Sequence, residues 1–276
     1  MAPLAENPTM MNPEMHAPHP LDRETFVLPA SMPVPGAGQV AINAAVIRAR
    51  QPVLIDTGLM ALRDPFLTAL ESVIDPADLR WIWVTHADAD HVGNLAPVLE
   101  RAPEARVVTC FLGMAKLAMQ GHLLDRVQLM NPGQTLDLGD RELVALRPPV
   151  YDAPETMAAF DRRSGTLFSA DSFGALLEEI PDEAGAIDGD ALRQGLLAWS
   201  AVDAPWLADI DRPSFRRALE TVRGLGAERV ASAHLPPAIG MTETLLGLLA
   251  EAPEQPPFVG PDQAAMEQLL AAATGA

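Results

Sequence analysis

Two histidines and two aspartates fall within a six-residue stretch near the middle of the chain: His86, Asp88, Asp90 and His91. They follow a short apolar run, Trp81 to Val84, and precede residues whose apolar spacing suits a helix. This order predicts a strand, a turn and the start of a helix. Such a turn can aim all four side chains into one small volume. Because metal ions require clusters of imidazoles and carboxylates of this kind, the stretch predicts a metal site.

A simpler explanation is a helix N-terminus rich in aspartate, since Asp caps helices and complements the helix dipole there. That explanation accounts for Asp88 or Asp90 singly, but not for the two histidines that flank them. Two further candidates lie far along the chain. Asp171 leaves a hydrophobic strand, and His234 ends another strand and is followed by two prolines. Strand ends are where sites are built in layered α/β folds, so these residues are candidate ligands as well.

Apolar periodicity predicts an α/β chain. Strands are expected at 26–28, 40–47, 52–55, 81–84, 106–109, 142–146, 156–160, 166–169 and 229–234. Helices are expected at 65–74, 95–99, 112–119, 189–199, 214–225, 242–249 and 261–273. Asp56 follows the strand at 52–55, and two interpretations stay open: it holds the backbone of a neighbouring site loop, or it only caps the turn.

Composition limits the partners. The chain of 276 residues has a formal net charge of -18, which repels phosphate backbones and anionic lipid. We therefore expect neither nucleic acid nor a membrane as a partner. The single cysteine, Cys110, allows no intrachain disulfide, and residues 1–19 contain no signal peptide or membrane anchor. A cytoplasmic location is expected. A homo-oligomer is also expected, although no feature of the sequence indicates one.

The order of these elements and the motif from His86 to His91 resemble the metallo-β-lactamase superfamily over about residues 40–249. The resemblance implies an α/β fold, an αββα sandwich of two mixed sheets with helices outside. The usual motif is His-x-His-x-Asp-His, so that Asp88 stands where a second histidine is usual. Flavodiiron proteins and their oxygen-binding diiron relatives carry an acidic residue there. Asp88 is one methylene shorter than the glutamate most common in that branch.

The same resemblance completes the ligand set. The segment from Ser169 to Gly174 resembles the motif of a bridging aspartate, Asp171, and His234 resembles the last ligand. The family's spacing points to Asp152, where the family has histidine; the surrounding prolines stiffen this loop. A turn-forming role for Asp152 stays open. The expected ligands of one ion are His86, Asp88, Asp152 and Asp171, and those of the second are Asp90, His91, Asp171 and His234.

Four carboxylates and three imidazoles make an oxygen-rich, anionic site, which favours iron or manganese over zinc. We expect two metal ions per chain, with iron the first choice and manganese and zinc the alternatives. The first functional hypothesis is a non-haem diiron protein that binds or reduces a small diatomic such as O₂ or NO. No Gly-rich phosphate loop follows a strand, so no bound flavin is expected in this chain, and turnover would need an external electron donor.

The second hypothesis is a two-metal hydrolase of a small ester, lactone or phosphoester, with a bridging water as nucleophile. In that case Asp90 has the catalytic role of orienting or deprotonating the water. The chain is thus expected to be either a metal-dependent oxidoreductase or a metallo-hydrolase, and a metal-binding protein without turnover is a third reading. Its expected organisation is a flexible tail at 1–22, a metallo-β-lactamase-like domain at 23–252, and a Pro-rich segment with a C-terminal helix at 253–276.

Overall fold

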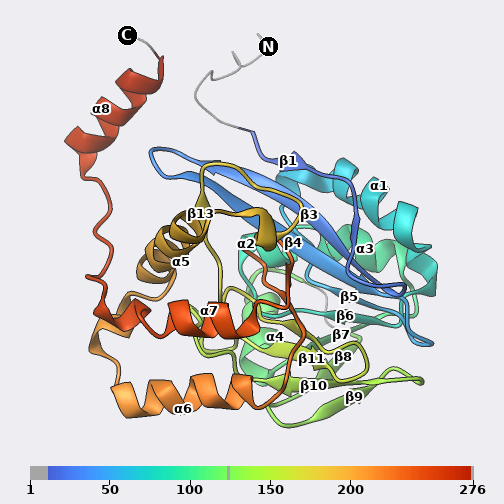
Figure 1. Ribbon diagram of the computed structural model, residues 1–276. Helices are drawn as coiled ribbons and strands as arrows, with labels where there is room; N and C mark the ends of the chain where they lie inside the picture. The colour runs from blue at the N-terminus through green and yellow to red at the C-terminus, as the bar shows by residue number, and fades with distance from the viewer. Residues whose placement is uncertain (1–11, 123–124, 275–276) are drawn as a thin grey trace, which may run out of the picture.

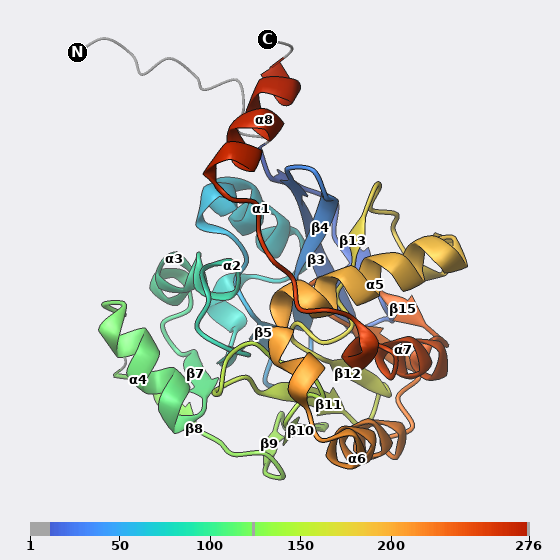
Figure 2. The same ribbon diagram turned by 90° about the vertical axis from the view of Figure 1, so that its left-hand side faces the viewer.

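The protein is an αββα sandwich, as the sequence predicted (Figure 1). The structure, a computed structural model, describes residues 12–122 and 125–274. Two sheets pack face to face, with α1 and α3 outside the first sheet and α5, α6 and α7 outside the second (Figures 1 and 2). None of the helices within the described residues is long and apolar enough to cross a membrane.

The first sheet has the strand order β1-β3-β4-β5-β6-β7-β8, with β2 added beside β3 and β13 beside β4. Its strands are β1 (Glu14–Met15), β2 (His19–Pro20), β3 (Thr25–Val34), β4 (Gly38–Ile47), β5 (Val53–Ile55), β6 (Trp81–Trp83), β7 (Arg106–Thr109), β8 (Val127–Leu129) and β13 (Leu176–Leu177). The strands from β5 to β8 run parallel, and Ile55 of β5 lies in register with Trp83 of β6. The carboxyl ends of β5 and β6 therefore meet at the same edge.

The second sheet has the strand order β15-β14-β12-β11-β10-β9. Its strands are β9 (Thr135–Asp137), β10 (Glu142–Leu146), β11 (Ala158–Asp161), β12 (Thr166–Phe168), β14 (Arg229–Ala231) and β15 (Ala238–Ile239). Because β12 and β14 are parallel neighbours, the loops that follow them leave the sheet side by side. Those loops carry Asp171 and His234.

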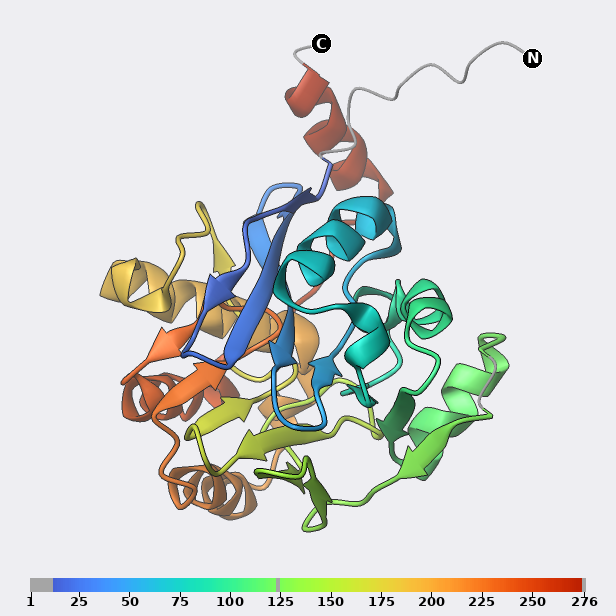
Figure 3. The same cartoon turned by 90° about the vertical axis from the view of Figure 1, so that its right-hand side faces the viewer.

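The helices in chain order are α1 (Arg63–Val73), α2 (Ala89–Val92), α3 (Leu95–Arg101), α4 (Phe111–Met119), α5 (Gly189–Asp203), α6 (Arg212–Arg223), α7 (Thr242–Leu249) and α8 (Gln263–Thr274). Asp211 caps α6 by accepting a hydrogen bond from Ser214 N, as expected of an N-cap aspartate. Figures 1 and 3 show α8 standing away from the two sheets, near the N-terminal end of the described chain.

Clusters of buried apolar side chains fill the spaces between the four layers. The middle one, between the sheets, includes Trp83, Val108, Leu143 and Phe168. Trp83 is fully buried there, and its indole N–H donates to the backbone oxygen of Met157, 3.1 Å away. A buried Trp needs such a partner, and this bond ties β6 to the segment that precedes β11. The two sheets are thus joined close to the candidate site.

Two parts of the chain differ from expectation. The single helix expected to follow His86 is two helices, because Gly93 ends α2 where the chain contacts the loop at Gly58 and Met60. A Cβ atom at Gly93 would lie 2.3 Å from Met60 N and 2.5 Å from Gly58 O. The segment assigned to a flexible tail is also partly structured: β1 and β2 pair with β3, which gives their backbone groups hydrogen-bond partners that the sequence does not reveal.

Candidate metal centre

The candidate ligands lie in loops that follow four strands. His86, Asp88, Asp90 and His91 follow β6 or lie in α2, Asp152 follows β10, and Asp171 and His234 follow the parallel strands β12 and β14. The two sheets bring these loops to one place. Asn43 of β4 holds the His234 loop directly, since its side-chain amide donates to the backbone oxygens of Ser232 and Leu235 at 2.9 and 2.8 Å.

Asp171 lies at the centre of the cluster, with three imidazoles around its carboxylate. Its Oδ2 is 3.2 Å from His86 Nε2. Its Oδ1 is 3.1 Å from the Nε2 atoms of both His91 and His234. One carboxylate oxygen therefore faces His86 and the other faces the remaining pair, which is the arrangement that a ligand shared between two ions requires.

The remaining candidates divide into two groups around Asp171. His86, Asp88 and Asp152 form what we call the His86 half-site, and Asp90, His91 and His234 form the His91 half-site. In each group one possible ligand atom per residue lies within 4.8 Å of the others. The structure thus brings together all seven residues that the sequence singled out.

In two of the histidines, the ring nitrogen that faces away from Asp171 lies within hydrogen-bond distance of another protein group. His91 Nδ1 lies 2.9 Å from Asp56 Oδ2, and His234 Nδ1 lies 2.9 Å from the backbone oxygen of Ala41. Such bonds fix the ring orientation and leave Nε2 as the atom that faces a ligand. Asp56 also accepts from the backbone N–H and hydroxyl of Thr85 at 2.8 and 2.7 Å. Two roles were left open for Asp56, and this geometry favours the one in which Asp56 holds the backbone of a neighbouring site loop.

Charges in the cluster strongly influence one another. Burial alone would lower the pKa of His91, but the carboxylates of Asp90, Asp171 and Asp56 raise it well above its ordinary value. Burial would raise the pKa of Asp171, yet the surrounding imidazoles lower it well below its usual range. For Asp152, burial prevails over attraction to His86 and raises the pKa of the carboxyl. These opposed shifts are typical of functional sites.

Unsatisfied buried atoms test whether these residues fit a metal ion. His91 and Asp171 are each 2% exposed; His91 Nε2 and Asp171 Oδ1 lie 3.1 Å apart, but neither atom makes a hydrogen bond of suitable geometry with any described residue. Buried polar atoms without partners are costly, so a ligand that takes up their lone pairs is expected. Carboxylate oxygens and imidazole nitrogens converging on one volume suit a cation. The residues present therefore fit a pair of metal ions.

Sequence reasoning missed Asp203, the last residue of α5, because the helix was expected to end at Trp199. One carboxylate oxygen of Asp203 lies within 4.8 Å of ligand atoms of Asp152 and Asp171. Burial and the negative charge of Asp171 raise the pKa of Asp203 to about 8. The only signal in the sequence is an acidic residue at a helix C-terminus, where the dipole disfavours negative charge.

Two glycines leave room for helix α5 to lie close to the site. A Cβ atom at Gly195 would lie 2.3 Å from Leu176 O, and one at Gly174 would lie 2.5 Å from the indole nitrogen of Trp199. The space at Gly174 lets Trp199 donate to the backbone oxygen of Asp171 at 3.2 Å and lie 4.4 Å, between ring centroids, from His234. Trp199 thus covers the His91 half-site.

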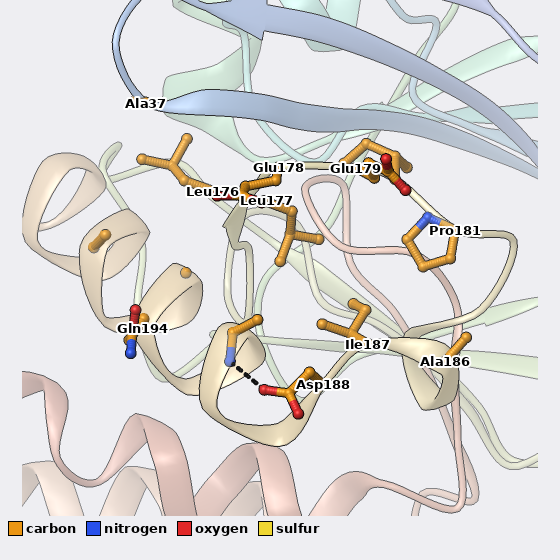
Figure 4. Close-up of a pocket in the computed structure, with 14 residues that line it drawn as sticks. Ala37, Leu176, Leu177, Glu178, Glu179, Pro181, Ala186, Ile187, Asp188 and Gln194 are labelled. Carbon is orange, nitrogen blue, oxygen red and sulfur yellow. Dashed lines mark hydrogen bonds between the residues drawn. The ribbon is translucent and has the colours of Figure 1, made fainter.

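A surface groove lies apart from this cluster. Its volume is about 550 Å³, and it lies between the β3–β4 turn, β13 and the start of α5 (Figure 4). Leu176, Leu177 and Ile187 supply apolar lining, while Asp188 accepts from Ala191 N at 3.1 Å to cap α5. None of the seven candidate ligands lines the groove.

Comparison with known proteins identifies relatives of this chain. The model of the ODP family beta lactamase matches residues 40–194, more than half of the chain. A putative diflavin flavoprotein A 2 from Nostoc sp. is 29% identical over 133 residues, covering 48% of this chain and 23% of the relative. The anaerobic nitric oxide reductase flavorubredoxin of Salmonella typhi is 30% identical over 134 residues, covering 48% and 28%. The chain therefore spans about a quarter of the length of these relatives.

Solved structures show the same fold. Rubredoxin oxygen:oxidoreductase from Desulfovibrio gigas matches with a TM-score of 0.77 and 21% identity, covering 86% of this chain and 62% of that one. A 1–254 fragment of putative diflavin flavoprotein A 5 from Nostoc sp. PCC 7120 matches with a TM-score of 0.72 and 20% identity, covering 88% and 96%. These matches confirm the predicted fold and the resemblance to flavodiiron proteins. On the strength of the family model, the chain belongs to the ODP family of beta-lactamase-fold proteins.

Proposed function

We propose that this chain is a non-haem diiron protein that binds or reduces O₂ or NO. The observation that carries the proposal is the position of Asp171, whose two carboxylate oxygens face imidazoles of different half-sites at 3.1 and 3.2 Å. Relatives named for nitric oxide reduction and for oxygen reduction with rubredoxin support the choice of gas and of metal.

The seven residues have distinct tasks in this proposal. His86, Asp88 and Asp152 would hold one iron, Asp90, His91 and His234 would hold the other, and Asp171 would be shared. Reduced iron, when bound, supplies the electrons and the open positions that a diatomic gas needs. Asp56 and Ala41 O fix the imidazoles, and Trp199 shields the His234 side from water. Electrons would come from a separate donor, for which a flavoprotein or a rubredoxin-like protein is the proposed class.

The hydrolase alternative assigns Asp90 as the base that deprotonates a bridging water. Asp90 Oδ2, however, lies 3.4 Å from the Nε2 atoms of both His91 and His234. Attraction to His91 also lowers the pKa of Asp90 in spite of its burial. A carboxylate with a lowered pKa is a weak base, and this position suits a metal ligand better. The homo-oligomer and the cytoplasmic location remain predictions.

Metal content is the first test. Protein purified without added metal is expected to hold close to two metal ions per chain, iron among them, because its seven candidate ligands are more than one ion needs. Elemental analysis measures the ions, and optical spectra of the chemically reduced protein before and after addition of O₂ or NO measure the reaction. A zinc-only protein that stays inert towards both gases after iron reconstitution would refute the redox proposal and favour the hydrolase.

Asp152 gives a second, more selective test. Its Oδ1 is 3.8 Å from His86 Nε2, so Asp152→Ala is expected to weaken only the ion of the His86 half-site, by about 10- to 100-fold. Asp152→His is expected to restore occupancy and shift the metal-centred spectrum. Metal titration of both variants measures this. Unchanged affinity and spectrum in both would show that Asp152 only shapes its loop.

A further inference from the structure

We infer that Asp203 is an additional metal ligand, which binds the ion of the His86 half-site and gives that half-site a preference for a hard cation. The inference rests on the proposed dimetal site. It assigns to Asp203 a role that the sequence motif does not contain, because this residue comes from α5 and not from any of the loops that carry the other ligands.

The position of Asp203 is fixed by its helix. The close approach of Gly195 to Leu176 O and the bond from Trp199 to Asp171 O hold the C-terminal half of α5 against the site. Asp203 lies one helical turn beyond Trp199, and i and i+4 side chains share a helix face. Its carboxylate is therefore directed to the same side as the indole, towards Asp152 and Asp171.

The carboxylate of Asp203 needs a partner that the described residues do not supply. Its Oδ2 is buried and has no hydrogen-bond partner among them. Asp171, which is 2% exposed, offers a carboxylate oxygen within 4.8 Å of those of Asp203 and Asp152. The helix dipole also disfavours a negative charge at the end of α5. A cation between Asp203, Asp152 and Asp171 would satisfy these oxygens together.

The consequence is a difference between the two half-sites. Asp203 groups with Asp152, a member of the His86 half-site. The inference therefore gives that half-site one imidazole and three carboxylates, whereas the His91 half-site has two imidazoles and one carboxylate. Carboxylate oxygens suit hard ions such as Mn²⁺, and imidazole suits Zn²⁺ and iron. The two positions should therefore differ in the metal that they prefer.

The test uses the full chain, freed of metal and titrated with Mn²⁺ alone while electron paramagnetic resonance measures unbound Mn²⁺. Wild type is expected to bind two Mn²⁺. Asp203→Asn is expected to weaken one of them about 10-fold or more and to leave the other unchanged. Asp190→Asn, an exposed aspartate at the other end of α5, is the matched control and should match wild type.

Thermal unfolding of the metal-free variants separates binding from folding. Asp203→Asn should raise the melting temperature of the metal-free protein, since it removes a carboxylate from a helix C-terminus, while it weakens metal binding. Asp203→Ser, a smaller replacement, should weaken Mn²⁺ binding to the same extent. It replaces the asparagine variant in the titration if that variant does not fold. If a folded Asp203 variant binds both Mn²⁺ ions with wild-type affinity, the inference about Asp203 is wrong, but the proposed dimetal site is not affected. A wild-type protein that binds fewer than two ions would overturn the dimetal site itself.

Discussion

Asp171→Ala is expected to abolish binding of both metal ions at once, the largest effect of any single substitution in the site. The variant removes a carboxylate whose Oδ2 faces His86 and whose Oδ1 faces His91 and His234. Each ion then loses a ligand, and two cations would face each other with less negative charge between them. Elemental analysis and metal titration measure the loss.

The same substitution should destabilise the metal-free protein. Three buried imidazoles lose their common counter-charge, and removing one partner of a buried charge pair costs about 3–5 kcal/mol. Asp182→Ala, which changes an exposed aspartate between β13 and α5, is the control and should leave both properties unchanged. Full metal occupancy in Asp171→Ala would rule out a shared ligand at this position.

Asp56→Ala is expected to cost about 3–5 kcal/mol of unfolding free energy, although Asp56 is not a proposed metal ligand. Its carboxylate is 2% exposed and has three partners: Thr85 N, Thr85 Oγ1 and His91 Nδ1. Its backbone φ is 57°, a left-handed conformation in which alanine is strained more than aspartate. Urea unfolding of the metal-free protein measures this cost.

Asp56→Asn tests the effect of Asp56 on the orientation of the His91 ring separately from its effect on folding. The amide preserves the size of the side chain but cannot act as an anionic partner of His91. We expect affinity for the ion of the His91 half-site to fall about 10- to 100-fold while the His86 half-site changes less. Asp137→Asn is the control, because the exposed side chain of Asp137, at the end of β9, accepts from Gly139 N and lies outside the proposed site. An equal loss from both half-sites would show that Asp56 acts on the loop as a whole and not through His91.

The sequence predicted the parts of this protein whose signals are local. The β-branched run of β4, the short apolar run of β5 and the apolar face of α7 all appear at the expected places. Six of the seven candidate ligands could be proposed from the sequence because they lie in motifs or directly after hydrophobic strands. The family's spacing, and not the local residues, gave Asp152 its place in that set.

The remaining parts depend on contacts between distant segments. β13 is only two residues long and exists because Leu176 pairs with Val40 across the sheet, which no local pattern reveals. The length of α5 is likewise set by packing against β13 and the site, so its last turn and Asp203 could not be found from periodicity. Backbone strain is also hidden from sequence: Ala170, beside Asp171, has φ 51°, and its backbone oxygen accepts a hydrogen bond from Ala233 N.

The division of the ligands between two sheets has a consequence for how the protein is made. During synthesis, the motif from His86 to His91 leaves the ribosome long before Asp171, and His234 follows only after α5 and α6. Neither half-site can close until the loop after β12 has emerged, and the His91 half-site must wait for β14. Contacts of such large sequence separation form late and slow folding. The nascent first sheet therefore exposes an incomplete, acidic ligand cluster, and iron is expected to enter only once the loop after β14 has been released.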